Sequence, residues 1–377
     1  MSSVSDPRAL RSLFRLQEGG LLLVIFVLGL LLTVFGGKVK VAEFKKGAAG
    51  EVERPVVEKN KFLNARNLTL LAKDTSFIAI MAVGMTFVIV SGGIDLSVGA
   101  IYALASVLGA LFFHYWGPEG PAAGSGVSGA VLGTLACLGT ATVCGFMNGG
   151  MIVLLRVHPF IITLGMMAIL RGVAFVLTKG QSVGSFPAAF RDLVANPTLP
   201  WSDGKISLSI GGVSMVPLMV MLLVTVGGGI YLTRTAAGRR IYAVGGNELA
   251  SRYSGLRVGR VKLSVYVISG FTSGIAALLA LGYYGGASSG DGPGYELNVI
   301  AAAVVGGASL SGGKGSALGA LLGALVIQMI GTGIVILGID QNYSQIIIGA
   351  VVILAVLLDQ LNAWLAKRRL VGRPAAQ

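Results

Sequence analysis

The sequence has little charge. Only 12% of its 377 residues are Asp, Glu, Lys or Arg, about half of the roughly 25% that is usual in soluble domains. Hydrophobic residues make up 54% of the chain, and the mean hydropathy is +0.81. A soluble α/β protein of this length would need far more charge on its surface, so that class is excluded. The composition indicates an integral membrane protein.

Cysteine and histidine are scarce, with two residues of each type. Cys137 and Cys144 lie about two helical turns apart in one apolar segment. This spacing puts them on one helix face as small packing groups and makes a disulfide between them implausible. His114 and His158 stand near segment ends, and we expect neither to have a direct functional role. We expect no metal site.

Glycine is abundant, at 57 residues, roughly twice the ~7% average, and small residues let helix backbones approach closely in lipid. Hydrophobic segments, most of them near the ~20 residues that cross a bilayer, follow one another along the chain. They span approximately residues 19–37, 68–90, 97–115, 127–150, 160–178, 210–232, 263–283, 298–308, 316–338 and 343–362. Because the segment 298–308 is short and enters a Gly-rich stretch, we expect a half-helix or a tilted helix there. The prediction is an all-α membrane protein of about ten transmembrane helices, some of them broken or re-entrant.

The net charge of +13 comes largely from basic residues that lie between or beyond the apolar runs, as in the cytoplasmic loops of membrane proteins. A face for nucleic acid would need folded soluble surface, so we expect no nucleic-acid partner. The first segment resembles a signal peptide without a convincing cleavage site, and we expect an uncleaved helix. With the N-terminus inside, about ten crossings return the C-terminus to the cytoplasm. The predicted organisation is a cytoplasmic tail at 1–18, a single transmembrane domain at 19–362 with a cytoplasmic loop at 233–262, and a cytoplasmic tail at 363–377.

One loop conflicts with the positive-inside tendency. Residues 38–67 are rich in Lys and Arg, yet this topology places them outside. Glu residues in the same stretch offset half of that charge, although Asp and Glu count little in the rule. We interpret residues 38–67 as an external insertion.

An acidic residue, Asp95, lies between two apolar runs. A carboxylate in a bilayer is costly and usually lines a cavity or pairs with a partner. Gly92 and Gly93 can break the helix just before it, which lipid tolerates only where protein or water satisfies the freed backbone groups. Two interpretations stay open: a gating role for this segment, or a short turn in which Asp95 caps the next helix.

The chain resembles the permease subunits of bacterial ATP-binding-cassette importers for ribose, xylose and galactose, in four blocks that keep their order over roughly residues 68–360. The blocks are Gly92-Gly93-Ile94-Asp95-Leu96-Ser97-Val98-Gly99; Asn148-Gly149 with 159–167 and Arg171-Gly172; 238–247 with Ala250 and Ser254-Gly255; and Gly306-Gly307 with Gly312-Gly313-Lys314-Gly315-Ser316. Residues 38–67 and the Pro- and Gly-rich loop after Trp116 depart from the family pattern. Either could alter the docking of a binding protein or be an inert surface addition.

The resemblance implies a function, the transmembrane permease subunit of an ATP-driven importer in the bacterial inner membrane, carrying a monosaccharide or related polyol. Its partners would be a cytoplasmic ATP-binding-cassette ATPase, an extracytoplasmic solute-binding protein, a second permease copy in a homo- or heterodimer, and the lipid membrane. The chain would be no enzyme and would bind no cofactor, because ATP and Mg would be held by the ATPase. The residues expected at the translocation path or its gate are Gly92, Gly93, Asp95, Ser97, Asn148 and Arg171.

The basic loop at 233–262 contains the signals of a short helix. Asn247 can cap a helix over residues 248–253, with Glu248 in its first turn and Gly255 as its stop. The resemblance implies that this helix docks on the ATPase, whereas spacing alone shows a capped, charged helix, and a purely topogenic loop is the alternative. The expected coupling residues are Gly246, Asn247, Glu248, Ala250, Ser251, Arg252 and Gly255.

The Gly-rich stretch 307–316 superficially resembles a phosphate-binding loop. It fails the pattern because Gly315 follows Lys314, where the motif needs Ser or Thr. We interpret it as a tight re-entrant or interhelical turn, so the energy source must lie on another polypeptide.

Two basic residues fall inside apolar segments. Arg171 could balance a buried acid such as Asp95, or it could bond backbone carbonyls. Lys73 is expected to snorkel to a membrane interface.

A secondary transporter driven by an ion gradient, with Asp95 as its ion site, is the competing hypothesis. Against it, the membrane segments offer few carboxylates for a relay. The transported solute is not specified by the sequence, because much of the selectivity in such importers lies in the binding protein.

Overall fold

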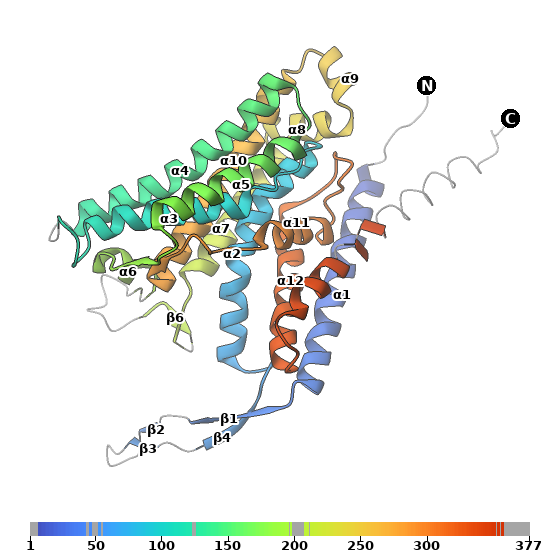
Figure 1. Ribbon diagram of the computed structural model, residues 1–377. Helices are drawn as coiled ribbons and strands as arrows, with labels where there is room; N and C mark the ends of the chain where they lie inside the picture. Colours follow the sequence, from blue (N-terminus) through green and yellow to red (C-terminus); the bar gives the residue numbers. More distant parts are fainter. Residues whose placement is uncertain are drawn as a thin grey trace.

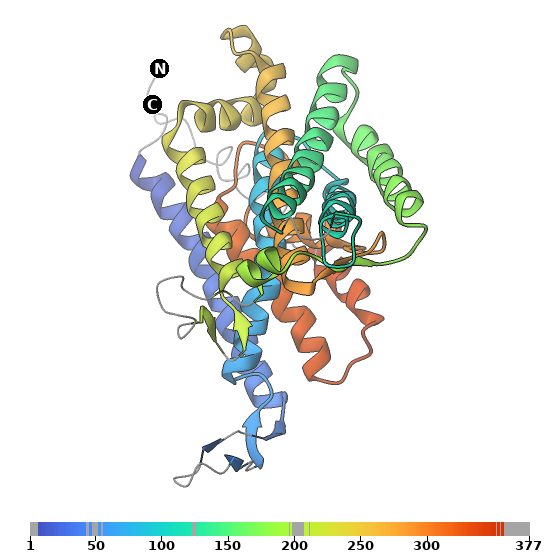
Figure 2. The same cartoon turned by 90° about the vertical axis from the view of Figure 1, so that its left-hand side faces the viewer.

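The computed structural model describes residues 7–357 except 43–44, 47–51, 54–55, 123–125, 196, 198–206, 211, 352 and 355. The helices are α1 (Pro7–Phe35), α2 (Ala65–Val90), α3 (Val98–Tyr115), α4 (Gly126–Leu155), α5 (Pro159–Thr178), α6 (Ala188–Val194), α7 (Val216–Arg234), α8 (Ala236–Gly246), α9 (Glu248–Tyr253), α10 (Val258–Tyr284), α11 (Tyr295–Val305) and α12 (Ala317–Ile336). The strands are β1 (Lys38–Ala42), β2 (Lys45–Lys46), β3 (Val52–Glu53), β4 (Val56–Asn60), β5 (Val183–Gly184), β6 (Ser209–Ile210), β7 (Val213–Ser214) and β8 (Gly286–Ala287). The β1–β4 ribbon projects from one end of the helix bundle, and α8 and α9 lie at the other end (Figures 1 and 2).

Seven of the described helices are long and apolar enough to cross a membrane: α2, α3, α4, α5, α7, α10 and α12. Residues 19–35 of α1 and the whole of α11 are apolar but shorter. The chain is therefore a multi-pass helical membrane protein. The predicted segment 298–308 falls on α11, whose length of 11 residues confirms the short helix expected there. The last predicted segment, 343–362, is helical from residue 343 but lies partly outside the described residues.

The prediction of an all-α chain is wrong in the connections, where the described residues form four two-stranded antiparallel sheets. The largest lies within the predicted insertion at 38–67 and pairs β1 with β4. Valine alternates with charged residues along β1, the pattern of a strand with unlike faces. Lys40 stands opposite Glu58 in the register, and the Lys38 ammonium lies 3.8 Å from the Glu58 carboxylate. Opposite charges across the ribbon favour this pairing.

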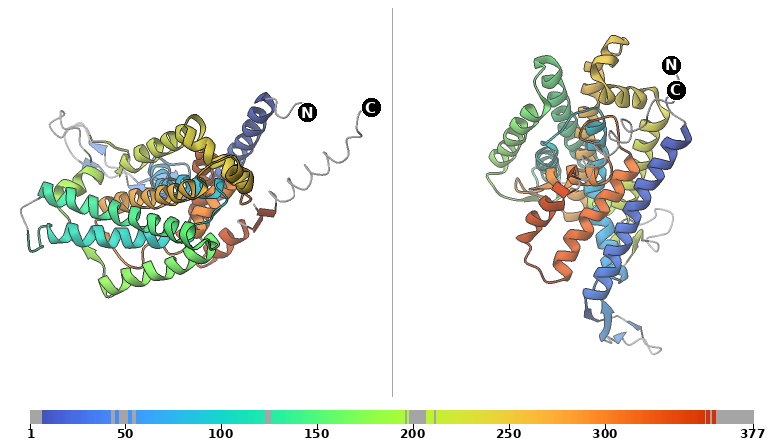
Figure 3. Two further views of the ribbon diagram at one scale, coloured as in Figure 1. Left: turned by 90° about the horizontal axis from the view of Figure 1, so that it is seen from above. Right: turned by 90° about the vertical axis from the view of Figure 1, so that its right-hand side faces the viewer.

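The buried core is centred on α2. In its most apolar stretch 94% of residues are buried inside the protein, against 72% for α3 and α10 and 22% for α5 and α7. Figure 3 shows α5 at one outer edge of the bundle and α1 on the opposite side. The outer helices expose large apolar side chains such as Ile161, Phe175 and Leu223. Lipid solvates such surfaces without the free-energy cost that water imposes, so this distribution fits a helix bundle in a bilayer.

Glycine lets α4 and α10 approach closely. A Cβ atom added at Gly270 of α10 would collide with the carbonyl oxygen of Ala141 and lie 2.9 Å from the Cα atom of Gly145, both in α4. The contact is backbone against backbone, so no flexible side chain can move aside. This is the packing that the glycine content of the sequence predicts.

We expect Gly270→Ala to lower the free energy of unfolding by about 1–3 kcal/mol, the usual cost of overpacking a core. The matched control is Gly139→Ala, because Gly139 lies in α4 and an added Cβ would meet nothing within 4 Å. That variant should be neutral or slightly more stable, since alanine is the better helix former. The thermal unfolding midpoint of the detergent-purified protein measures both, and equal midpoints would contradict the packing argument.

Candidate functional site

The connection between α2 and α3 is a true break in the helix path. Gly92 has φ +82°, in the left-handed region that favours glycine, and follows the C-cap Ser91. At Gly93 a Cβ atom would lie 2.6 Å from the hydroxyl oxygen of Tyr266, so a larger residue there would have to displace this buried side chain. The Tyr266 hydroxyl donates to the carbonyl oxygen of Ile94 at 3.2 Å and satisfies one freed backbone group. The helix break predicted at these two glycines is confirmed.

Asp95 is fully buried just after this break. Its Oδ1 accepts hydrogen bonds from the backbone N–H of Ser97 at 3.0 Å and from the Ser97 hydroxyl at 2.6 Å. Its Oδ2 accepts from the hydroxyl of Ser269 in α10 at 3.1 Å. Asp95 therefore closes the short turn that one interpretation predicted before α3 and ties that turn to a second membrane helix. It does not cap α3, whose N-cap is Ser97 without a side-chain cap bond.

Asn148 extends this network into α4. Its Nδ2 donates to the Ser97 hydroxyl oxygen at 2.7 Å and lies 3.5 Å from Asp95 Oδ1. Its Oδ1 is buried and has no hydrogen-bond partner among the described residues. The side chains of Asp95, Ser97, Asn148 and Ser269, which we name the polar cluster, thus join the α2–α3 connection to α4 and α10. Within the described residues, hydroxyl, amide and backbone N–H groups hold the carboxylate.

Arg171 is not part of the polar cluster. Its guanidinium donates to the backbone carbonyl oxygens of Ser289 at 3.4 Å, Asp291 at 3.2 Å and Gly292 at 3.4 Å. Of the two roles left open for Arg171, bonding of backbone carbonyls is the one observed. It fixes the segment between β8 and α11, and a role for Arg171 in translocation or gating stays a prediction.

Lys73 does not snorkel to an interface. Only 5% of its surface is exposed, and its ammonium lies 2.6 Å from the Asp74 carboxylate and 3.1 Å from the Tyr284 hydroxyl. The same ammonium stands 4.4 Å from the ring centroid of Tyr283. An adjacent acid and two tyrosines thus hold the charge inside the protein. The tyrosines lie about 210 residues away in the sequence, so the hydropathy around Lys73 could not indicate them.

The cytoplasmic loop predicted at 233–262 contains two helices, α8 and α9. Asn247 caps α9, its side-chain oxygen accepting from the Ala250 N–H at 2.9 Å. Gly255 ends this turn with φ +84°, its N–H donating to the Arg252 carbonyl oxygen at 3.1 Å. The predicted capped helix over 248–253 is confirmed, and Gly246 is the last residue of α8.

One side of α9 is held and another is exposed. The Glu248 carboxylate pairs with Lys262 of α10 at 2.7 Å and with Arg252 at 3.1 Å, while Ser251 is buried. Leu249 and Tyr253 are 64% and 88% exposed, and as an i,i+4 pair they share one face of the helix. Sequence reasoning missed both of them. Large apolar side chains on a short capped helix in a basic loop were the available signal.

The end of α8 lies directly against the end of α2. The Gly313 N–H donates to the carbonyl oxygen of Val90 at 2.8 Å, and the Tyr242 hydroxyl of α8 donates to the Gly315 carbonyl oxygen at 2.7 Å. A Cβ atom at Gly245 would collide with the Val90 carbonyl oxygen. The Gly-rich turn between α11 and α12 is therefore an interhelical turn, as predicted. It connects α8 to the residue just before the break that holds Asp95.

The contact of α9 with α10 should weaken in acid. The hydrogen bond from Lys262 holds the pKa of the Glu248 carboxyl below its ordinary value, with the charges of Lys262 and Arg252 in support and partial burial opposing. A lowered pKa means that the stabilisation is complete above the ordinary value of about 4.3 and is lost as the pH falls through the lower folded-state value. At pH 6 we expect amide hydrogens of α9 to exchange more slowly than in Glu248→Gln, and the difference should vanish once the pH falls below the lowered folded-state pKa. A difference that persists in acid would contradict this assignment.

The chain is similar in sequence to membrane permeases of known transport systems. A family model described as "branched-chain amino acid transport system / permease component" matches residues 67–356, so the match begins after the β1–β4 ribbon. The ribose import permease protein RbsC of Escherichia coli (strain K12) is 37% identical over 298 residues, which cover 79% of this chain and 87% of that protein. The fructose import permease protein FrcC of Rhizobium meliloti is 34% identical, covering 83% and 82%. The xylose transport system permease protein XylH of Escherichia coli (strain K12) is 32% identical, covering 79% and 86%. No solved structure matches.

Proposed function

We propose a function from one premise, that this chain belongs to the family of transport-system permease components whose model it matches over residues 67–356. It is the multi-pass membrane permease of an ATP-binding-cassette sugar importer in the bacterial inner membrane. It performs no covalent chemistry and binds no cofactor, because in this family a separate ATPase protein binds and hydrolyses ATP. The predicted identity as an importer permease is confirmed by these relationships.

The substrate that we propose is a monosaccharide such as a pentose or hexose. The observation that carries this proposal is the similarity to ribose, fructose and xylose permeases, at 32–37% identity over about four fifths of each chain. We further propose that a solute-binding protein delivers the sugar on the outer side and that two permease copies form the pathway. The competing hypothesis of an ion-driven transporter is not favoured, because the chain belongs to a family of importer permeases whose ATPase is a separate protein.

The proposed orientation puts α8, α9 and both chain termini in the cytoplasm, with about ten crossings. Two observations support it: α1 begins at the end of the bundle that carries α9, and the β1–β4 ribbon lies at the opposite end (Figure 2). The basic residues of 233–262 then lie inside, as the positive-inside rule expects.

The proposed mechanism couples α9 to the polar cluster. An ATPase that moves α9 would displace α8, and α8 contacts Val90 and the Gly-rich turn directly. Because Val90 is followed at once by the break, that displacement reaches the segment 91–97 and the hydrogen bonds of Asp95. Two arrangements of these bonds would belong to the inward- and outward-facing states, and ATP binding would favour one of them by differential affinity.

The test is purification of the tagged permease in mild detergent with identification of co-purifying proteins, paired with uptake of radiolabelled ribose, xylose and fructose by cells. We expect recovery of a cytoplasmic ATPase and uptake of at least one sugar that stops when ATP is depleted. Sugar uptake that persists without ATP but collapses with the ion gradient would refute the proposal.

A further inference from the structure

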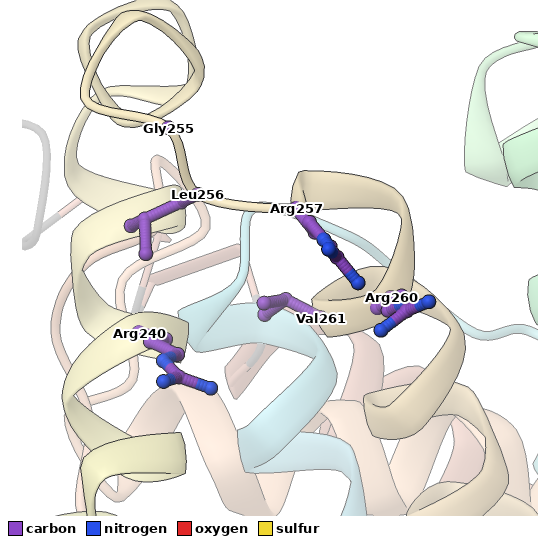
Figure 4. Close-up of a pocket in the computed structure, with 6 residues that line it drawn as sticks. All are labelled: Arg240, Gly255, Leu256, Arg257, Arg260 and Val261. Atoms are coloured by element: carbon purple, nitrogen blue, oxygen red, sulfur yellow. The ribbon is translucent and has the colours of Figure 1, made fainter.

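A pocket of about 320 Å³ opens between α8 and the start of α10. Its lining residues are Arg240, Gly255, Leu256, Arg257, Arg260 and Val261 (Figure 4). The arginine side chains come from two directions, one from α8 and two from the first turn of α10 and the residue before it (Figure 4). We name this the arginine pocket.

The arginine pocket carries positive charge without compensation. No acidic residue lines it, and Arg240, Arg257 and Arg260 form no ion pair with a carboxylate in the part of the chain that the structure describes. Glu248, the acid of the neighbouring helix α9, is already engaged by Lys262 and Arg252. Guanidinium groups prefer planar, bidentate partners with several acceptor oxygens, and phosphate supplies them.

The position of the pocket at the end of a membrane-crossing helix favours a lipid as the source of the phosphate. The helix α10 starts at Val258 and its apolar run begins near residue 263, so residues 255–261 lie at the end of a membrane-crossing segment. Leu256 and Val261 are only partly exposed and give the pocket an apolar side beside its three cations. A lipid head group presents the same combination, a phosphate above an apolar glyceride, and basic pockets at the cytoplasmic ends of membrane helices suit anionic lipids.

We propose that the arginine pocket binds the phosphate of an anionic phospholipid from the cytoplasmic leaflet. The proposal rests on the orientation given under the proposed function. A bound head group would bridge α8 and α10, the two helices that flank α9. Lipid occupancy would therefore restrain the coupling helices and make transport sensitive to the anionic lipid content of the membrane.

The test is native mass spectrometry of the delipidated full-length permease in detergent, titrated with phosphatidylglycerol. Arg240→Gln/Arg257→Gln removes two pocket charges, and Arg234→Gln/Arg239→Gln is the matched control with the same charge change on α7 and α8 outside the pocket. We expect the pocket variant to lose affinity for the lipid at least about tenfold, since each basic residue contributes about a factor of five. The control should change less than threefold.

Two results would overturn the proposal. If millimolar inorganic phosphate displaces the lipid and stabilises lipid-free protein through the same arginines, the site is one for free phosphate. If both variants bind lipid equally and only the pocket variant loses the co-purifying ATPase, the arginines face an acidic surface of that partner. Because lipid binding is measured without transport, a negative result here leaves the import function untouched.

Discussion

Replacing Asp95 with asparagine is expected to lower ATP-driven sugar uptake about tenfold while leaving membrane insertion and assembly intact. Asparagine has the shape of aspartate, and its oxygen can still accept from the Ser97 N–H and hydroxyl. Its amide, however, would donate toward Ser269 instead of accepting from it. A hydrogen bond to a charged group contributes about 1.5–3 kcal/mol, so a bond that differs between two conformations shifts their ratio about tenfold or more.

The control for this substitution is Asp192→Asn, which makes the same chemical change on an exposed residue of α6. It should leave uptake unchanged. Asp95→Ala serves a second purpose, because it leaves the hydroxyls of Ser97 and Ser269 without their acceptor in a buried site. We expect that variant to lose about 1–3 kcal/mol of stability. Normal uptake by Asp95→Asn would remove Asp95 from the mechanism and leave it a purely structural group.

Features that depend on neighbouring residues in the chain could be predicted. The spans followed from the bilayer thickness, the cap at Asn247 and the stop at Gly255 from local hydrogen bonding, and the break at Gly92 from backbone freedom. The β1–β4 ribbon was missed although valine alternates with lysine along β1, because β4 does not alternate and the charge of the stretch indicated a surface insertion. Backbone hydrogen bonds must all be made within the protein only inside the bilayer. The composition rule that predicts helices there does not apply to an insertion outside the membrane.

Features that join distant segments could not be predicted. Asp95 and Ser269 are 174 positions apart, and Arg171 and Gly292 are 121 apart. Nothing in an apolar run marks Ser269 above other small polar residues, since a buried hydroxyl can satisfy itself on its own helix. The polar cluster could therefore be placed at Asp95 but not completed, and the choice between the two roles of Arg171 stayed open until the structure showed its carbonyl partners.

The same limit applied to the coupling helix, whose local caps were evident while its exposed face was not. Leu249→Glu/Tyr253→Glu is expected to weaken binding of the ATPase about a hundredfold. Both side chains point away from the protein, so the change should leave the fold intact. Anchoring residues of this kind contribute on the order of 1–2 kcal/mol each or more when a partner buries them, and a carboxylate in their place adds a desolvation cost.

Ala250→Pro tests the same contact through the backbone. Ala250 lies in the first turn of α9, where proline is tolerated, but its N–H makes the cap bond to Asn247, and losing a cap costs about 0.5–2 kcal/mol. We expect Ala250→Pro to weaken coupling less than the double variant does, so the two should rank in that order in ATPase co-purification and in sugar-stimulated hydrolysis. Leu337→Glu/Tyr343→Glu, a pair of exposed residues beyond α12 and outside the loop 233–262, is the control. If both α9 variants keep the ATPase, the contact lies elsewhere and α9 is only a topogenic element.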